Sequence, residues 1–203
     1  MDAPFPSPPA ALDTDDWDRY EQSSGVVFSL PTTEVSEHTL VYEDATVRRT
    51  IHEATHGGLD RVWRFFFVTR LTISPPPPPG VGTASFYPTV AAEARDGFAA
   101  DLRERGFENV ERHRGQRMRT GSGKRARLTK FTADSPVERE GTETRLPTEG
   151  WLAVWADGSE FRLAGGAYPT TFEAALTDDE RASLDLAPST YRNDLLELLR
   201  EVE

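Results

Sequence analysis

The sequence predicts an α+β fold in which one antiparallel sheet of about six to eight strands has helices packed on it. Two observations support this prediction. Most neighbouring strand-like runs are joined by short glycine-containing turns, which is typical of hairpins. Helical periodicity is confined to a few segments, chiefly at about 88–105 and 189–202, and it does not alternate with strands as it would in a parallel sheet.

The beginning of the chain differs in composition from the rest. Residues 1–20 contain a group of prolines followed by a group of aspartates. This composition favours a loosely attached segment over a packed element. We therefore expect a flexible arm at residues 1–20 and a single α+β domain at residues 21–203.

The pattern between residues 26 and 73 is that of β-strands. Residues 26–30 and 40–42 are short apolar runs, and residues 46–55 are rich in β-branched side chains. Residues 62–73 form the clearest strand, because large apolar side chains occur on both of its faces. Residues 56–60 contain two glycines, so we expect them to connect the last two strands as a hairpin loop.

A run of prolines then interrupts the strands. Residues 75–79 are all proline and are followed by Gly80, a combination that neither a helix nor a strand tolerates. Residues 75–80 are therefore expected to form a stiff connector inside the domain. Pro88 stands where a first helical turn would begin, and apolar residues follow at helical spacing until Gly106, which predicts a helix at about 88–105.

The second half of the chain begins with further hairpins. Residues 107–120 and 125–133 flank a Gly-Ser-Gly turn, which predicts one hairpin. Residues 151–156 are apolar on both faces and should form a central strand. Asp157-Gly158, a strong two-residue hairpin signal, connects this strand to the run that follows.

Two helices should complete the fold. Gly165-Gly166 and Pro169 are expected to end the last strand. Thr177 and Glu180 have the spacing of a capping box, which predicts the start of a short helix. Residues 189–202 carry apolar side chains at helical spacing and should form the last helix.

The order of elements and the closing hairpin around Trp155, Asp157 and Gly158 resemble the PsbP-type fold, an antiparallel sheet between helices. This resemblance implies an arrangement of elements and transfers no activity. The segments 65–79 and 151–169 also resemble parts of an uncharacterised family of haloarchaeal proteins. That second resemblance implies membership of a family without an assigned function.

The charge composition is acidic and contains very little lysine. The chain has 34 acidic and 23 basic residues, for a net charge of −11, and only Lys124 and Lys130 are lysines. This composition resembles that of haloarchaeal cytoplasmic proteins, in which molar salt screens the mutual repulsion of surface carboxylates. The resemblance implies a halophilic setting and says nothing about function.

Several classes of protein are not expected. The chain has no cysteine, which excludes disulfides, thiolate zinc sites and a cysteine nucleophile. No segment approaches the roughly 20 apolar residues of a membrane span. The first residues lack the basic and apolar regions of a signal peptide, so we expect a cytoplasmic protein without a membrane partner.

One short motif resembles a catalytic site. His52-Glu53-Ala54-Thr55-His56 matches H-E-x-x-H, the motif of zinc metallopeptidases, in which the two histidines bind zinc and the glutamate acts as general base. The resemblance covers five residues and implies His52 and His56 as metal ligands and Glu53 as the catalytic base. If residues 46–55 form a strand, however, the histidines stand about 13 Å apart and cannot share a metal. Zinc is therefore expected only under this alternative function, and otherwise no cofactor is expected.

A second motif is a strongly basic hairpin. Between residues 112 and 130 there is no acidic side chain, although the chain as a whole is acidic. The basic side chains of this segment, which we call the basic ribbon, are Arg112, Arg114, Arg117, Arg119, Lys124, Arg125, Arg127 and Lys130. The Gly-Ser-Gly-Lys sequence within it resembles a phosphate-binding loop only in part, and a flexible hairpin tip is the better interpretation.

Three interpretations of the basic ribbon are open. It could be a solvated face, or it could pair with carboxylates of the same chain, such as Glu138, Glu140 and Glu143, or with the acidic arm. It could bind an acidic protein partner, or it could bind RNA or another polyanion. We therefore expect a non-enzymatic binding or accessory protein, with the zinc hydrolase as the alternative. A third hypothesis is that the sheet holds an apolar small ligand near the aromatic residues 63–67.

Overall fold

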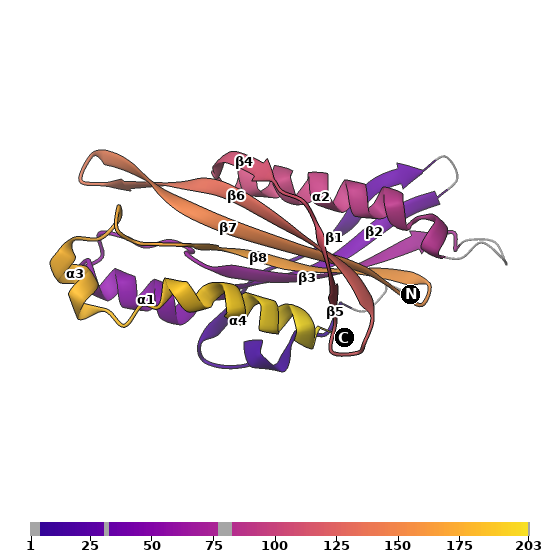
Figure 1. Ribbon diagram of the computed structural model, residues 1–203, viewed down its shortest axis with the longest axis horizontal. Helices are drawn as coiled ribbons and strands as arrows, with labels where there is room; N and C mark the ends of the chain where they lie inside the picture. Colours follow the sequence, from indigo (N-terminus) through magenta and orange to yellow (C-terminus); the bar gives the residue numbers. More distant parts are fainter. Residues whose placement is uncertain (1–4, 31–32, 77–82, 203) are drawn as a thin grey trace.

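The computed structural model, which describes residues 5–30, 33–76 and 83–202, contains one eight-stranded antiparallel sheet (Figure 1). The strand order is β1-β2-β3-β8-β7-β6-β4, and β5 pairs with β6 beyond the end of β4. This confirms the predicted α+β class and the antiparallel sheet. The strands are β1 (Trp17–Leu30), β2 (Thr33–Asp44), β3 (Phe65–Ser74), β4 (Glu108–Arg112), β5 (Gln116–Arg119), β6 (Arg125–Arg139), β7 (Thr142–Asp157) and β8 (Glu160–Pro169).

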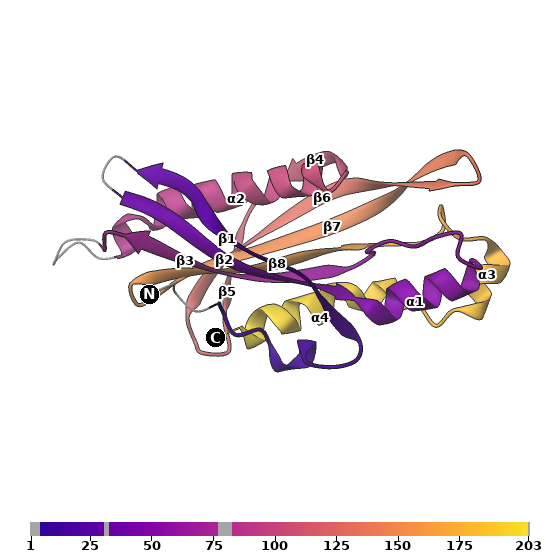
Figure 2. The same ribbon diagram turned by 180° about the vertical axis from the view of Figure 1, so that it is seen from behind.

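Helices cover both faces of the sheet, so the fold has three layers. The long helix α2 lies on one face, and α1 and α4 lie on the other (Figures 1 and 2). The helices and short 3-10 turns are η1 (Ala10–Leu12), α1 (Ala45–Ala54), η2 (Thr83–Ser85), α2 (Tyr87–Glu104), α3 (Asp178–Ser183) and α4 (Pro188–Glu201).

The sheet separates two hydrophobic cores, and β7 contributes to both. Trp151, Ala153 and Trp155 face the core under α1 and α4, whereas Leu152 and Val154 face the core under α2. All five side chains are buried. Alternation at every second residue of a strand produces this division, and it confirms that residues 151–156 form a central strand.

The prediction that Gly165-Gly166 ends a strand is wrong, because both glycines lie in the middle of β8, which ends at Pro169 as predicted. A Cβ atom at position 165 would clash with the backbone oxygen of Trp151 and lie 2.7 Å from Cε1 of Phe67, and one at position 166 would clash with the backbone oxygen of Phe65 and lie 2.8 Å from Cδ1 of Leu195. Glycine is therefore required here chiefly by the close approach of the backbone of the neighbouring strands.

The strand predicted at residues 46–55 is also wrong, because these residues form helix α1. Asp44 caps this helix: its carboxylate accepts a hydrogen bond of 2.8 Å from the backbone N–H of Val47. Val47 and Ile51, four residues apart, are both buried against the sheet. The cap and this apolar face outweigh the β preference of the branched side chains, so residues 56–60 form a helix-to-strand connection instead of a hairpin loop.

The first strand begins earlier than the sequence pattern indicates. Strand β1 starts at Trp17 and pairs with β2 along its whole length, so its first residues belong to the segment predicted as an arm. The carbonyl oxygen of Asp16 accepts a hydrogen bond of 2.9 Å from the backbone N–H of Ala45. This contact attaches the segment before β1 to the start of α1.

The predicted helices agree closely with those of the structure. Helix α2 occupies Tyr87–Glu104 and α4 occupies Pro188–Glu201, each within one residue of its prediction, and Thr177 forms the predicted capping box at α3. Most of the predicted proline connector, residues 77–80, lies outside the described residues. In the described part of the chain, no helix has the length and apolar character needed to span a bilayer.

Candidate functional site

The metallopeptidase-like motif lies on a helix, but the helix ends inside it. His52 and Glu53 belong to the last turn of α1, and both side chains are exposed. His56 follows the helix with a φ of 50°, and Gly57 has a φ of 82°. The backbone N–H of Gly57 donates to the carbonyl of His52 at 2.8 Å, which closes the helix as a C-cap.

This geometry lacks the ligand set that a zinc hydrolase needs. His56 stands outside the helix, so His52 and His56 do not form the regular i, i+4 pair on one helical face. Within residues 5–30, 33–76 and 83–202, no three side chains of histidine, aspartate or glutamate gather closely enough to hold a metal ion. In the described part of the chain, a zinc ion held by His52 and His56 would therefore lack a third protein ligand, and Glu53 would have no zinc-bound water to act on.

The basic ribbon forms the outer edge of the sheet, opposite to the edge made by β1. Strands β4 and β5 both pair with β6 along this edge. The predicted hairpin at the Gly-Ser-Gly turn is present as the β5–β6 hairpin. The structure thus places the eight basic residues on three neighbouring strands and their connections.

Three of the eight basic side chains have carboxylate partners. Arg112 pairs with Asp96 of α2 at 2.8 Å, and Lys124 pairs with Asp157 at 2.9 Å. Lys130 pairs with a glutamate of the adjacent strand β7, as described next. These contacts attach the ribbon to α2 and to the central hairpin.

The contact of Lys130 belongs to a partly buried network beside the α4 core. Its ammonium group lies 2.5 Å from Glu149, and the hydroxyl of Tyr168 donates to the same carboxylate at 2.9 Å. Burial alone would raise the pKa of Glu149, but the hydrogen bonds from Lys130 and Tyr168 together lower it. The same burial raises the pKa of Tyr168 well above its usual range. Lys130 therefore has a structural role and does not belong to an exposed binding surface.

Four arginines form a surface without internal counter-charges, which we call the arginine face: Arg117, Arg119, Arg125 and Arg127. Arg117 lies directly opposite Arg127 across the hairpin, and Arg119 lies directly opposite Arg125. All four side chains are exposed, and none makes an ion pair within the described part of the chain. Side chains directly opposite each other have Cβ atoms about 5 Å apart, so two like-charged pairs are held together on one hairpin.

Strand alternation assigns the arginine face to the α2 side of the sheet. Ala126 and Leu128 of β6 are buried in the core under α4, so Arg125 and Arg127 point to the opposite side. Burial, together with the charges of Arg112 and Arg127, lowers the pKa of Arg95 on α2. Positive charge therefore extends from the hairpin onto the adjacent helix. Arg114, in the connection before β5, is also exposed and has no ion pair in the described residues.

The tip of the hairpin is fastened to the rest of the protein. The backbone N–H of Gly121 donates to the carbonyl of Arg200 at the end of α4, at 2.5 Å. Thr120 closes the turn by accepting a hydrogen bond of 3.1 Å from the backbone N–H of Lys124. A Cβ atom at position 121 would lie only 2.8 Å from the Arg200 oxygen. The turn is therefore held in place by α4, which was not expected of a flexible hairpin tip.

The internal partners considered for the ribbon do not contact it. Glu143 lies 3.4 Å from Arg145, and neither Glu138 nor Glu140 makes an ion pair with a described residue of the ribbon. Asp16 hydrogen-bonds to Thr46 at the start of α1, away from the ribbon. The carboxylates that do pair with the ribbon are Asp96 of α2 and, in β7, Glu149 and Asp157.

The hypothesis of a ligand site near the aromatic residues 63–67 points to one further feature, a cavity between α2 and strands β1–β3 that Phe65 and Phe67 help to line, but sequence reasoning missed its carboxylates. The lining combines apolar side chains with five carboxylates from β1, β2 and α2. No short motif connects these residues, because three strands and a helix bring them together only in the folded chain.

Comparisons with known proteins identify a family without an assigned activity. Neither a search of curated proteins nor a search of solved structures gives a match. One family profile, described as a domain of unknown function (DUF6517), matches residues 4–203. Since this match covers almost the whole chain, the protein belongs to the DUF6517 family.

Proposed function

We propose that this protein is a non-enzymatic binding protein whose arginine face holds an acidic, extended segment of a partner protein. The observation that carries the proposal is the pair of like-charged contacts, Arg117 with Arg127 and Arg119 with Arg125, in a chain of net charge −11. Like charges directly opposite each other destabilise a hairpin. The chain has 34 acidic residues, yet none of them lies opposite these four arginines in the hairpin. We therefore infer that the counter-charges come from a binding partner.

The geometry of the hairpin supports an extended ligand. Successive arginines on one face of a strand are about 6.6–6.8 Å apart, because the rise is about 3.3–3.4 Å per residue. An extended peptide with an acidic residue at every second position has the same repeat. Each guanidinium group can bind a carboxylate through two parallel hydrogen bonds, which a lysine cannot do.

A protein ligand is favoured over RNA because the arginine face has no stacking platform. Proteins that bind single-stranded RNA combine basic side chains with exposed aromatic rings. Among the described residues, the large exposed apolar side chains are Tyr20, Val26 and Val27, all on β1 at the opposite edge of the sheet.

The test is direct binding with purified full-length protein. Fluorescence anisotropy compares a labelled poly-glutamate peptide with a labelled oligouridine, at about 0.1 M and about 1 M salt, where the Debye length is about 10 Å and about 3 Å. The proposal expects the peptide to bind more tightly than the RNA at both salt concentrations. Tighter binding of oligouridine, with an affinity that falls steeply with salt, would support RNA and overturn the proposal.

Matched charge-reversal variants locate the interaction. Arg117→Glu with Arg119→Glu should weaken peptide binding by about tenfold to a hundredfold, because two attractive contacts become repulsive. Arg19→Glu with Arg49→Glu makes the same change in net charge at exposed positions on β1 and α1 and should have little effect. Equal losses in the two variants would show that only the overall charge matters.

A further inference from the structure

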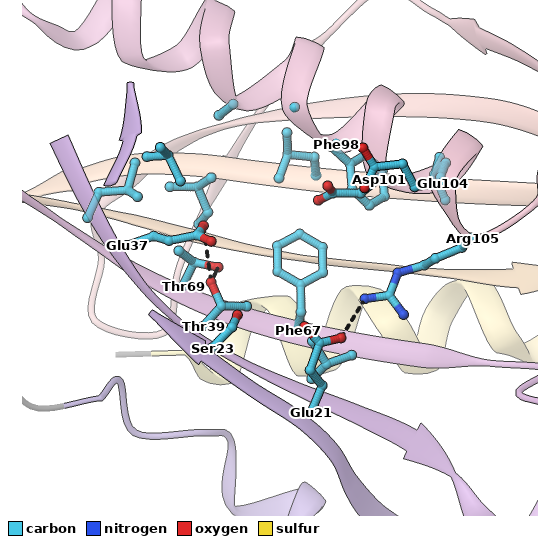
Figure 3. A pocket seen from close by; sticks show the side chains of 18 of the residues that line it. Glu21, Ser23, Glu37, Thr39, Phe67, Thr69, Phe98, Asp101, Glu104 and Arg105 are labelled. Carbon is cyan, nitrogen blue, oxygen red and sulfur yellow. Dashed lines mark hydrogen bonds and ion pairs between the residues drawn. The ribbon is translucent and has the colours of Figure 1, made fainter. Parts of the chain in front are cut away.

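A cavity of about 550 Å³ lies between α2 and strands β1–β3. Its volume is within the range of about 300–1,000 Å³ that is typical of small-molecule sites. Phe67 of β3 stands at the centre of the labelled residues, with Asp101 and Phe98 of α2 across from it (Figure 3). The cavity is separate from the arginine face, which lies on β5 and β6 at the other edge of the sheet.

Two irregularities in β1 shape the rim of this cavity. The pairing of β1 with β2 skips one residue between Arg19 and Glu21 and another between Val26 and Phe28. The skipped residues are Tyr20 and Val27, which line the cavity although they are 52% and 43% exposed. A β-bulge re-aims a side chain, and bulges are common beside functional sites. Exposed apolar groups at the mouth of a cavity favour a ligand with an apolar part.

The floor of the cavity is aromatic, and the packing of the sheet makes room for it. The rings of Phe67 and Phe98 have their centroids 5.5 Å apart. Gly165 leaves the space that the ring of Phe67 occupies, since a Cβ atom there would lie 2.7 Å from Cε1 of Phe67. Phe67 is nevertheless only half-buried, so part of its ring faces the cavity.

The polar groups around this floor are overwhelmingly acidic. The lining includes one basic side chain, Arg105, which already pairs with Glu21 at 3.2 Å. The lining carboxylates are Glu21, Glu37, Glu93, Asp101 and Glu104. Figure 3 shows Glu37 on one side of Phe67 and the Glu21–Arg105 pair on the other. This arrangement leaves the cavity with a surplus of negative charge.

Two of these carboxyl groups are held in an unfavourable environment. Burial, and then the charges of Glu104 and Glu21, raise the pKa of Asp101 in spite of Arg105. Burial, and then the charges of Asp101 and Glu21, raise the pKa of Glu37, although a hydrogen bond of 3.3 Å from Thr39 opposes this. A positive charge placed between Asp101 and Glu37 would stabilise both carboxylates and would oppose the rise in both pKa values.

We propose that this cavity binds an organic cation that carries an apolar chain or ring. Charge complementarity to the carboxylate rim selects a cation, and the ring of Phe67, which is only half-buried, can add a cation–π contribution. The apolar part of the ligand would lie against the floor and against Tyr20 and Val27 at the rim. An anionic amphiphile would meet the same carboxylates with repulsion and is excluded by this argument.

The experiment compares three probes that share one apolar chain: octyltrimethylammonium, octanol and octanoate. Isothermal titration calorimetry with the full-length protein, below the concentration at which the probes form micelles, measures the three affinities. The cation should bind at least about tenfold more tightly than octanol, and octanoate should bind most weakly of the three. Octanol or octanoate binding as tightly as the cation would overturn the proposal.

Isosteric variants assign the effect to the cavity. Glu37→Gln with Asp101→Asn should lower the affinity for the cation about tenfold and leave that for octanol unchanged. The matched control is Glu138→Gln with Asp179→Asn, which removes two exposed carboxylates far from the cavity. An unchanged cation affinity in a folded Glu37/Asp101 variant would show that the cation binds elsewhere.

A third variant tests the aromatic floor. Phe67→Leu keeps an apolar side chain but removes the ring, so it should weaken binding of the cation more than binding of octanol. Equal losses for both probes would show that the ring contributes only apolar area. Circular dichroism of each variant verifies that the protein remains folded.

Discussion

Reversing the charge of the two β5 arginines should stabilise the isolated protein while it weakens binding. Arg117→Glu with Arg119→Glu converts two repulsive contacts of the β5–β6 hairpin into two attractive ones, with Arg127 and Arg125 respectively. If the arginine face is maintained for a partner, the free protein bears its electrostatic cost. Removing that cost should therefore raise the free energy of unfolding.

The expected gain can be worked out from the hairpin. A favourable or unfavourable cross-strand charge pair contributes about 0.2–1 kcal/mol, so each reversal changes the balance by about 0.4–2 kcal/mol. The lower strand preference of glutamate and the added negative charge of the whole protein reduce the sum. We expect a net gain of about 1–2 kcal/mol, which raises the melting temperature by about 2–8 °C in a protein of this size.

Thermal unfolding followed by circular dichroism measures this gain at two salt concentrations. The increase in melting temperature should be largest at about 0.1 M salt and should almost disappear at about 1 M, because exposed charges are then screened. The control with Arg19→Glu and Arg49→Glu should be unchanged or slightly less stable. A double β5 variant that is less stable than the parent protein at low salt would refute the reasoning about like-charged contacts.

Three further variants test the fold. Asp44→Ala removes the helix cap and leaves the buried Arg64, 2.8 Å away, without its main partner. Urea unfolding should therefore show a loss of about 3–5 kcal/mol in the free energy of unfolding. Asp44→Asn, which keeps a capping oxygen, should cost less. Gly166→Ala should cost about 1–3 kcal/mol or more by urea unfolding, because the new Cβ would clash with the backbone oxygen of Phe65 and would lie 2.8 Å from Cδ1 of Leu195, and a stability equal to that of the parent would contradict this packing. Hydrogen bonds from Arg139 hold the pKa of Glu180 down at about 2, below its ordinary 4.5, so the stability it contributes is present above pH 4.5 and is lost as the pH falls toward 2. Glu180→Gln should flatten the pH dependence of stability in this window, and an unchanged acid limb would contradict that role.

The sequence predicts most of the fold because its strongest local signals are also favourable in the folded state. Gly158, with a φ of 64°, lies in the β7–β8 turn where the two-residue hairpin was expected. The periodic apolar residues of α2 and α4 face the two cores as predicted. A second two-residue turn, Glu140-Gly141, was overlooked although both of its residues have positive φ. Its glycine is a signal, but glutamate is an uncommon residue at the first position.

Helix α1 shows where local propensity fails. Thr46, Val47, Thr50 and Ile51 all favour strands, and together they predicted one. The decisive features are the cap by Asp44 and the spacing of buried residues, and the second of these is recognisable only when the position of the sheet is known. The literal H-E-x-x-H match begins on a helix, but the helix ends inside the match at Ala54, so His56 lies outside it.

The two binding surfaces differ in how far they can be read from the sequence. The basic ribbon is contiguous, so composition alone finds it, but only the folded structure shows that Lys130 pairs with Glu149 whereas Arg117 and Arg127 make no ion pair with a described residue. Of the cavity, the sequence indicates only the aromatic segment at residues 63–67 and not the carboxylates. Glu37 and Asp101 are far apart in the chain, and β2 and α2 bring them to one site only when the three layers assemble.

The pairing of β3 with β8 has a consequence for how the chain acquires its structure. Val68 pairs with Ala164, so the strands that join the two halves of the sheet are separated by nearly one hundred residues. Closing so long a loop is entropically costly and makes folding slow. During synthesis, β3 must wait with its inner edge unpaired until β8 leaves the ribosome, and the core under α1 and α4 cannot be completed before α4 follows. The nascent chain therefore exposes an apolar strand edge throughout the synthesis of the segment between β3 and β8, and this is the stage at which it is most vulnerable to aggregation.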